Sequence, residues 1–252
     1  GDEQWECADV ITELQRRGTV SVYEIAVGLL TDRNPAARMA ACDVLGQLGW
    51  ADGKPFGTQS LLHLLGRTTE ANRHVLGAAI TALGHLGATN AVPAVLAHEI
   101  CNDEQVRFSL ACALPNMVHA DAGEDDAGVQ ALMRLTTDES AEVRDWATFG
   151  LGTQLRVDGD AVRDCLRARL EDGDADTRCE ALKGLRQRND AETIQHLTAA
   201  LRRTTAAPQE VELAYEWGDP DLLGALENMQ AWWTIVPALL RDAVDACRTP
   251  AT

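Results

Sequence analysis

The feature that most constrains the fold of this chain is a segment of twelve residues that recurs five times. The copies begin 31 to 38 residues apart, and we number positions from the first residue of each copy, which is position 0. Position +7 is leucine in every copy, position +6 is valine or a small residue, and position +3 is alanine or leucine. This spacing predicts a helix with one buried face. The copies are residues 38–49, 76–87, 107–118, 144–155 and 178–189.

A second apolar segment lies between successive copies, and each is about one short helix long. Short links rich in Asp, Gly and Asn join the two kinds of segment, as in residues 171–176. Pro93 stands early in its segment, where the first turn of a helix tolerates proline. A helical pair repeated at this interval predicts an all-α solenoid, in which each pair buries its apolar face against its neighbours. The second segments are residues 58–66, 90–99, 126–136, 160–170 and 191–202.

We expect one domain over residues 1–252. The clear repeats span 31–203, residues 2–30 are predicted to be an atypical N-terminal helix pair, and residues 208–248 a degenerate repeat followed by a cap. A solenoid needs atypical end units because its last apolar face would otherwise meet water. We expect that cover from Trp232, Trp233, Ile235, Val236, Leu239 and Leu240.

An acidic residue stands six positions before position 0 in four of the five copies. An acid in the turn between two helices can accept hydrogen bonds from free N–H groups at the helix start, and it can pair with an arginine. Position 0 is arginine in four copies, so stacked repeats are expected to form a ladder of such pairs, with Asp138 the partner of Arg144. The acids are Asp32, Glu70, Asp138 and Asp172.

Two patterns together resemble the HEAT-repeat family: Asp-x5-Arg, and the helix Arg-x2-Ala-x3-Leu-Gly, both best kept in residues 32–46 and 138–152. The similarity is to the short bacterial type of HEAT repeat, which also occurs in phycobilin lyases. The stretch VRDWATFGLG at 143–152 is similar to a signature of uncharacterised bacterial members. The resemblance implies a right-handed α-solenoid of about six to seven helical hairpins with a C-terminal helical cap. It also implies that the recurring helices line a concave groove, but it implies no particular activity.

The net charge of −17 argues against nucleic acid as a partner, because binding to phosphates needs a positive surface. The same field repels anionic membranes, and no apolar run is long enough to span a bilayer. The first residues are acidic and lack a secretory signal, so we expect a cytoplasmic protein. HEAT-type DNA glycosylases fit poorly for the same electrostatic reason.

The cysteines are odd in number, widely spaced, and show no CxxC or Cys/His cluster. We interpret them as reduced core residues, and we expect no metal and no cofactor. Motifs for nucleotide binding, zinc peptidases and serine hydrolases are missing, so catalysis stays uncertain and is the less favoured reading. The cysteines are Cys7, Cys42, Cys101, Cys112, Cys165, Cys179 and Cys247.

Positions +1, +2, +5, +9 and +12 of the recurring helix are expected to face the groove. Position +9 is polar in every copy, and Trp146 at +2 with Phe149 at +5 would form an aromatic wall. Two plainer interpretations stay open: the aromatic pair packs against a neighbouring helix, and the polar row is an ordinary solvated face. Cys112 as a nucleophile, with His85 or His119 as its base, is a further alternative. The candidate binding residues are Asp43, Gln47, His85, Asn116, His119, Asp145, Trp146, Phe149 and Thr153.

The leading functional hypothesis is a scaffold that binds a segment of a partner protein in its groove and catalyses nothing itself. Net acidity favours a basic partner. The alternative is a small-molecule-binding protein, or a lyase- or isomerase-like enzyme by analogy with phycobilin lyases. A closed apolar pocket under Trp146 and Phe149 would favour that alternative, whereas an open groove would favour a protein partner. A third hypothesis is a structural subunit that forms a weak homodimer near Trp232 and Trp233, rather than a monomer.

Overall fold

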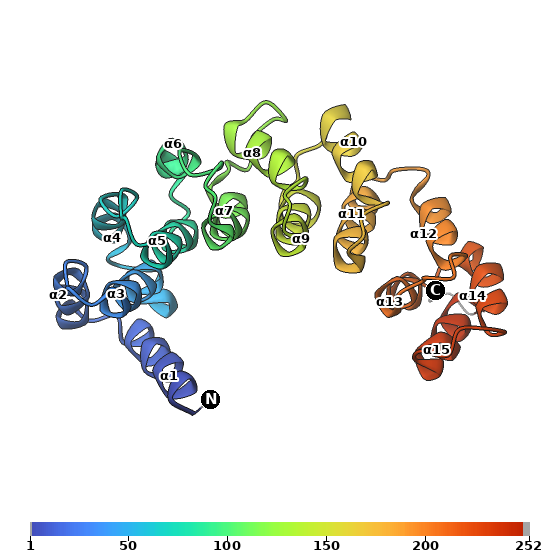
Figure 1. Ribbon diagram of the computed structural model, residues 1–252, viewed down its shortest axis with the longest axis horizontal. Coiled ribbons are helices and arrows are strands. Elements are labelled where there is room, and N and C mark those ends of the chain that lie inside the picture. Colours follow the sequence, from blue (N-terminus) through green and yellow to red (C-terminus); the bar gives the residue numbers. More distant parts are fainter. Residues whose placement is uncertain (1, 249–252) are drawn as a thin grey trace. The chain divides into compact units, whose positions relative to one another are not determined.

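The computed structural model describes residues 2–248, with side chains from Asp9 onward, so Cys7 lies outside the described side chains. Helices make up the regular structure of this part of the chain, and it contains no strand. The chain forms two compact units, Gly1–Gly150 and Leu151–Thr252, and we describe each by itself. A single solenoid over residues 1–252 stays a prediction. The all-α solenoid class is confirmed by the alternation of helices shown in Figure 1.

The first unit consists of two sets of helices. Helices α3, α5, α7 and α9 carry the recurring segments and pack side by side in chain order, and we call them the repeat row. The helices between them pack against this row: α4 contacts α3 and α5, and α8 contacts α7 and α9. The helices are α1 (Asp2–Arg17), α2 (Val20–Leu29), α3 (Pro35–Gln47), α4 (Gly57–Leu65), α5 (Arg73–His85), α6 (Val92–Leu96), α7 (Glu104–Met117), α8 (Ala127–Leu135) and α9 (Ala141–Phe149).

The second unit repeats this plan. Helix α11 packs beside α13, and α13 beside α15, while α10, α12 and α14 pack against them. Between α9 and α10 the chain passes through a π-helical turn, Gly150–Gln154. The helices are α10 (Asp160–Arg169), α11 (Ala175–Gln187), α12 (Thr193–Leu201), α13 (Pro208–Trp217), α14 (Leu223–Met229) and α15 (Pro237–Arg248).

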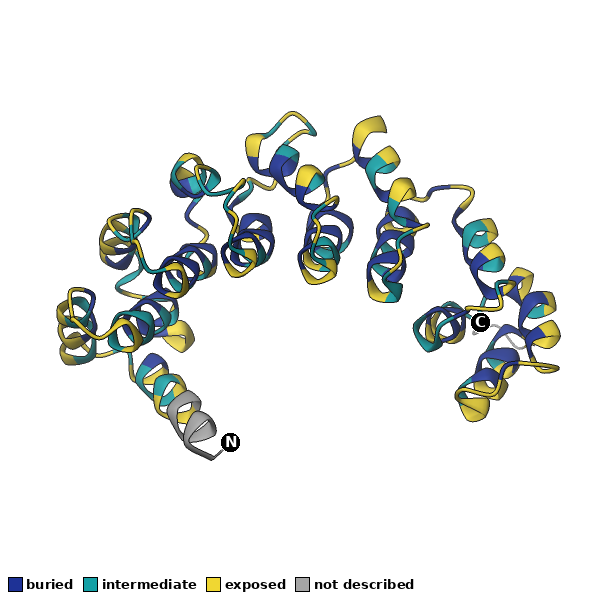
Figure 2. Cartoon of the chain, viewed as in Figure 1, coloured by how far each residue is buried: buried dark blue, intermediate teal, exposed yellow. Residues whose placement is uncertain are grey.

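The predicted buried face of the recurring helix is confirmed. Every residue at position +7, from Leu45 to Leu185, is fully buried, and the residues at position +3 are at most 1% exposed. Figure 2 shows that exposed residues lie on the outward surfaces and loops of the helices. The apolar periodicity therefore specifies which side of each helix enters the core.

Small residues at two fixed positions set the distance between neighbouring helices of the repeat row. A Cβ atom on Gly46 at position +8 would lie 2.8 Å from the Cα of Ala82, which is position +6 of the next copy. Gly84 meets Ala113 in the same way at 2.7 Å. In the second unit, a Cβ on Gly184 would lie 2.6 Å from the Cα of Gly152. Position +6 is small because the neighbouring backbone touches it there.

Arginines at position 0 join consecutive repeats, but with a different register from the one expected. Arg107 donates two hydrogen bonds to Asp138, of 2.7 and 3.0 Å, so Asp138 is paired with the arginine of the preceding repeat. The expected pairing of Asp138 with the Arg144 side chain is wrong: Arg144 donates instead to the Asp138 backbone carbonyl, at 2.9 Å. Arg38 likewise holds Glu70 of the next repeat and the carbonyl of Asp32. The arginine thus reaches forward to an acid and back to a turn.

Arg188 is a buried arginine for which the sequence pattern predicted no role. Its guanidinium donates to five backbone carbonyls in the second unit, at 2.7 to 3.3 Å, which satisfies all of its polar atoms. Burial lowers its pKa, yet the ring of carbonyl oxygens keeps the cation solvated. The acceptors belong to Leu151, Gly152, Leu155, Val157 and Gly184, so Arg188 fixes the end of the π-helical turn.

The expected cover of the last apolar face is only partly right. Trp233 is 3% exposed and donates from Nε1 to the carbonyl of Ala206 at 2.9 Å, and Leu240 is also buried. Trp232, Ile235 and Val236 are exposed instead. They lie in the irregular link between α14 and α15, where side chains do not follow the helical period that turns one face toward the core.

Candidate functional site

A groove crosses the repeat row of the first unit, over α3, α5 and α7. Its volume is about 320 Å³. All of its lining residues stand at positions −2, +1, +2 or +5 of their repeats, so one face of three successive helices forms it. We call it the row groove, and its lining residues are Met39, Asp43, His74, Gly77, Ala78, Thr81, Gln105 and Ser109.

The row groove is open because two of its positions carry almost no side chain. Gly77 and Ala78 occupy positions +1 and +2 of the middle helix, where α9 carries Asp145 and Trp146. A Cβ on Gly77 would lie 2.9 Å from Ser109 Oγ, so glycine also allows α7 to approach at this point. The small side chains at these two positions therefore leave the space that forms the groove.

Asp43 is the only carboxylate in the lining of the row groove. Burial raises the pKa of this carboxyl to about 6, because the ionised form loses contact with water. No hydrogen bond or ion pair within the described part of the chain reaches its side chain. Gln15 of α1 donates to the Asp43 backbone carbonyl at 2.8 Å and leaves the carboxylate untouched.

The far side of the row groove supplies neutral polar atoms. Ser109 Oγ donates to the Gln105 carbonyl at 2.9 Å, which leaves the oxygen lone pairs of Ser109 available as acceptors. Thr81 and the Gln105 side chain add a hydroxyl and an amide. The groove therefore combines one unpaired carboxylate with several neutral acceptors.

Three aromatic rings form a cluster on α7 and α9. Trp146 packs edge to face against Phe108 on one side and Phe149 on the other, with ring centroids 5.8 Å apart in both pairs. Trp146 remains 38% exposed, and Phe108 and Phe149 are half-buried. Both interpretations of the aromatic pair thus hold in part: the rings pack together, and they also present apolar surface to solvent. We call Phe108, Trp146 and Phe149 the aromatic cluster.

The remaining predicted residues lie at the ends of the repeat-row helices. Gln47 and His85 are the last residues of α3 and α5, Asn116 is the next to last of α7, and His119 follows α7. Lys54 Nζ donates to the His85 carbonyl, and desolvation together with the Lys54 charge lowers the pKa of the His85 imidazole. None of these four lines the row groove, because position +9 falls at or next to the end of each helix and His119, at position +12, lies beyond the end of α7.

Three other candidates have separate surroundings. Asp145 is half-buried on α9. Thr153 lies in the second unit, where its hydroxyl donates to Glu180 at 3.1 Å. Burial and the nearby Glu142 carboxylate raise the pKa of Cys112 to about 12, so its thiol is protonated at neutral pH and is a poor nucleophile.

Several lining residues and one ring were missed by the sequence analysis. Met39 and Gly77 at position +1, His74 and Gln105 at position −2, and Phe108 were not among the candidates. The signal that could have found them is the register itself. Positions −2, +1, +2 and +5 lie on one side of a helix, whereas position +9 lies a further turn on, at the helix end.

The same positions line a second, acidic cleft in the second unit. Position −2 is Asp176, +1 is Cys179, +2 is Glu180 and +5 is Lys183, and α13 completes a cleft of about 130 Å³. Lys183 is paired with Glu180 at 3.0 Å. The residues from α13 are Gln209, Glu212, Leu213 and Glu216.

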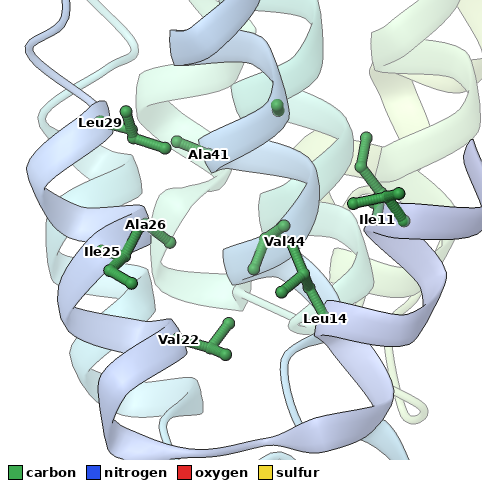
Figure 3. A pocket seen from close by; sticks show the side chains of 10 residues that line it. Ile11, Leu14, Val22, Ile25, Ala26, Leu29, Ala41 and Val44 are labelled. Carbon is green, nitrogen blue, oxygen red and sulfur yellow. The ribbon is translucent and has the colours of Figure 1, made fainter. Parts of the chain in front are cut away.

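An apolar groove lies at the other end of the first unit, between α1 and α2. Figure 3 shows Ile11 and Leu14 of α1 facing Val22 and Ile25 of α2. Its volume is about 190 Å³, and Ala41 and Val44 of α3 contribute to its lining. Ile25 is 65% exposed, so much of this apolar surface meets solvent.

No helix between residues 2 and 248 is both long enough and apolar enough to span a bilayer. Within the described side chains, no three His, Cys, Asp or Glu residues are grouped as metal ligands.

Comparisons with known proteins agree with this architecture. A family model described as HEAT repeats matches residues 129–216. Protein YibA of Escherichia coli (strain K12) is 33% identical over 105 residues, which is 42% of this chain and 37% of YibA. The match thus spans little more than a third of that relative's length.

Solved structures show the same fold. The X-ray structure of Escherichia coli YibA aligns with a TM-score of 0.67 at 23% identity, covering 94% of this chain and 85% of that one. The complex of CpcE and CpcF of phycocyanin lyase from Nostoc sp. PCC7120 gives a TM-score of 0.52 at 17% identity, covering 89% and 94%. The chain thus matches HEAT repeats over residues 129–216, and the solved structures support the fold of a HEAT-repeat helical solenoid.

Proposed function

We propose that the first unit is a protein-interaction module. It binds a segment of a partner protein over the row groove and the aromatic cluster, and it catalyses nothing itself. The observation that carries this proposal is the exposed Trp146 of α9, held between Phe149 and Phe108, of which Phe108 belongs to α7, a helix that also lines the open polar groove. Rigid aromatic rings beside polar groups are typical anchors of protein interfaces.

The lining of the row groove supports a protein segment rather than an enclosed small molecule. Its residues are both polar and apolar, and it opens along the face of three helices. None of the three rings of the aromatic cluster lines the row groove, so the rings do not enclose it. The net charge of −17 supports a basic partner, because opposite charge speeds association.

The test is affinity capture from lysate with the wild-type protein, with Trp146→Ala/Phe149→Ala, and with Trp50→Ala. Trp50 is 52% exposed in the turn Trp50–Asp52, outside the aromatic cluster, so it controls for the loss of any exposed indole. Mass spectrometry identifies both proteins and small molecules. The expected result is a protein that the wild type and Trp50→Ala retain and the double variant loses.

The captured protein is then purified and its affinity measured directly. The double variant is expected to bind at least roughly tenfold more weakly, since an aromatic anchor typically contributes 2 kcal/mol or more. Leu110→Ala, at a fully buried position, serves as the control for loss of core packing, and it is expected to lower the free energy of unfolding by about 2–5 kcal/mol. Equal capture of the same partner by the wild type, Trp50→Ala and the double variant would contradict the proposal. A small molecule lost selectively by the double variant would favour the ligand-binding alternative.

A further inference from the structure

Asp43 differs from the other half-buried acids that border the repeat row. Glu70 is held by Arg38, and Asp138 by Arg107, each through two hydrogen bonds. The Asp43 carboxylate has no such partner among the described residues. A partly desolvated carboxylate without a partner is unfavourable in the free protein, and a cation placed beside it removes that cost.

The row groove has room and chemistry for that cation. Met39, Gly77 and Ala78 supply an apolar wall against which an aliphatic stem can pack. Thr81, Gln105 and Ser109 supply neutral acceptors for the remaining N–H groups of an ammonium or guanidinium. These groups come from three helices, so the arrangement is a pocket and not a lone surface charge.

Among the described residues, the lining of the row groove contains one titratable group besides Asp43. His74 of α5 lines the groove, whereas α7 contributes only Gln105 and Ser109 to the lining. Helix α1 reaches Asp43 through the neutral Gln15, and α2 and α4 contribute nothing to the lining. Burial raises the pKa of the adjacent Cys42 to about 12, so that thiol stays neutral.

We infer that the row groove is a receptor for one basic side chain of a partner, with Asp43 as its counter-ion. The terminal cation sits beside the carboxylate, and the stem lies along Ala78. This inference rests on the proposed interaction function and names the chemistry that it recognises. Arginine and lysine share that chemistry, and the experiment distinguishes them.

The test uses three small probes and backbone amide NMR of the full chain. The probes are the N-acetyl methylamides of arginine, lysine and citrulline, of which citrulline is the uncharged counterpart of arginine. The expected result is saturable shifts at Ala78, Thr81 and Gln105 with arginine or lysine, and none with citrulline. The tighter of the two cationic probes identifies the preferred side chain. Equal binding of citrulline, or no saturable shifts with any probe, would overturn the inference.

Two variants test the residues directly, and their own spectra report whether they are folded. Asp43→Asn keeps the shape of the side chain and is expected to abolish binding of the cationic probes. Ala78→Leu fills the groove and is expected to do the same without changing any charge. Unchanged affinity in either folded variant would refute the pocket.

The pH profile separates the two titratable groups. Because the pKa of Asp43 lies at about 6, affinity for the arginine probe is expected to fall from pH 7.5 to pH 5. His74→Gln is expected to keep this fall, which rules out histidine protonation as its cause. A flat profile in His74→Gln would overturn the role of Asp43.

Trp146→Ala/Phe149→Ala distinguishes this inference from the function on which it rests. The double variant is expected to bind the arginine probe as well as the wild type does. Failure of the probe experiment leaves aromatic-dependent capture of a partner intact. Failure of aromatic-dependent capture, with the probe still bound, would instead contradict the proposed interaction surface.

Discussion

At the scale of single residues, the buried charges of this protein fall into two kinds. Arg107 and Asp138 satisfy one another at 2.7 Å, and Arg188 is surrounded by carbonyl oxygens, so these charges stabilise the packing between repeats. Asp43 has no such partner among the described residues, and burial of its ionised form disfavours the folded state at neutral pH. A residue that costs stability without serving the core is a good candidate for a functional role.

Replacement of Asp43 by asparagine is expected to stabilise the protein at neutral pH. The pKa of Asp43 is about 6 in the folded state and about 3.9 in the unfolded chain, so the folded state keeps this proton to a higher pH. Between these values the folded state binds more protons, so stability falls as pH rises and stays reduced above that window. We expect a gain of roughly 1–2 kcal/mol at pH 7.5, discounted because the groove is open to water. Urea unfolding at pH 4 and pH 7.5 measures it.

Asp138→Asn is the matched control, with the opposite sign. Burial opposes ionisation of Asp138, but the hydrogen bonds from Arg107 win and lower its pKa. Its contribution to stability is therefore present above the unfolded pKa and lost as pH falls. Asp138→Asn should destabilise the protein at pH 7.5. If both variants shifted stability in the same direction, the assignment of Asp43 as an uncompensated charge would be wrong.

At the scale of elements, the repeat row is held together by close backbone contact as well as by apolar burial. Gly46 and Gly84 stand where a Cβ atom would lie under 3.0 Å from the next helix. Such positions cannot accept a larger residue unless the helices move apart. The Leu-Gly pair that ends the recurring pattern is therefore a packing device as well as part of a helix.

Gly84→Ala is expected to destabilise the first unit by roughly 1–3 kcal/mol. The new methyl group would lie 2.7 Å from both Cα and Cβ of Ala113, and this overlap outweighs the better helix propensity of alanine. Gly28→Ala is the matched control, because nothing lies within 4 Å of a Cβ there. The control should be neutral or gain up to about 1 kcal/mol. Equal effects of the two substitutions in thermal unfolding would contradict the close-contact account.

At the scale of the whole molecule, the net charge of −17 governs how the protein meets other molecules. A field of this size attracts basic partners and acts before contact, so it changes association more than dissociation. The acidic cleft between α11 and α13 adds to the same field in the second unit.

Salt should therefore slow the association of a purified partner. Raising the NaCl concentration from about 50 to 500 mM shortens the Debye length to a few ångströms and screens the field. We expect a fall of roughly tenfold in the association rate with a smaller change in the dissociation rate. Stopped-flow measurement of the intrinsic tryptophan fluorescence can follow both rates. An association rate that ignores salt would argue against a basic partner.

The sequence predicted the helices well because their signals are local and repeated. Leu45 and its equivalents specify the buried face, and the resemblance supplied the pairing of helices. The pairing of Asp138 could not be predicted, since the choice between Arg107 and Arg144 depends on the offset between stacked repeats. Trp232 and Ile235 were expected to cover the last apolar face because they are large and apolar, but they lie in an irregular link, which the sequence does not distinguish from a helix.

The candidate site was predicted only in part, for a geometric reason. Asp43, Trp146 and Phe149 stand at positions +2 and +5 and lie where surface features form. Gln47, His85 and Asn116 share polarity at position +9, yet each lies at or next to the end of its helix. Shared polarity in a sequence does not report whether a helix still continues at that residue. The row groove is formed by side chains of three neighbouring helices, so it depends on their packing and not on the pattern within any one of them.

The contacts at positions +6 and +8 also bear on how such a chain can change over time. The residues at positions +6 and +8, which space the helices of the first unit, do not line the row groove, although Gly77 in its lining also allows α7 to approach. A duplicated helical pair would bring its own spacing residues with it and add a fresh set of surface residues in the same register. Selection can therefore rewrite what the surface recognises, one repeat at a time, while the scaffold beneath it is inherited unchanged.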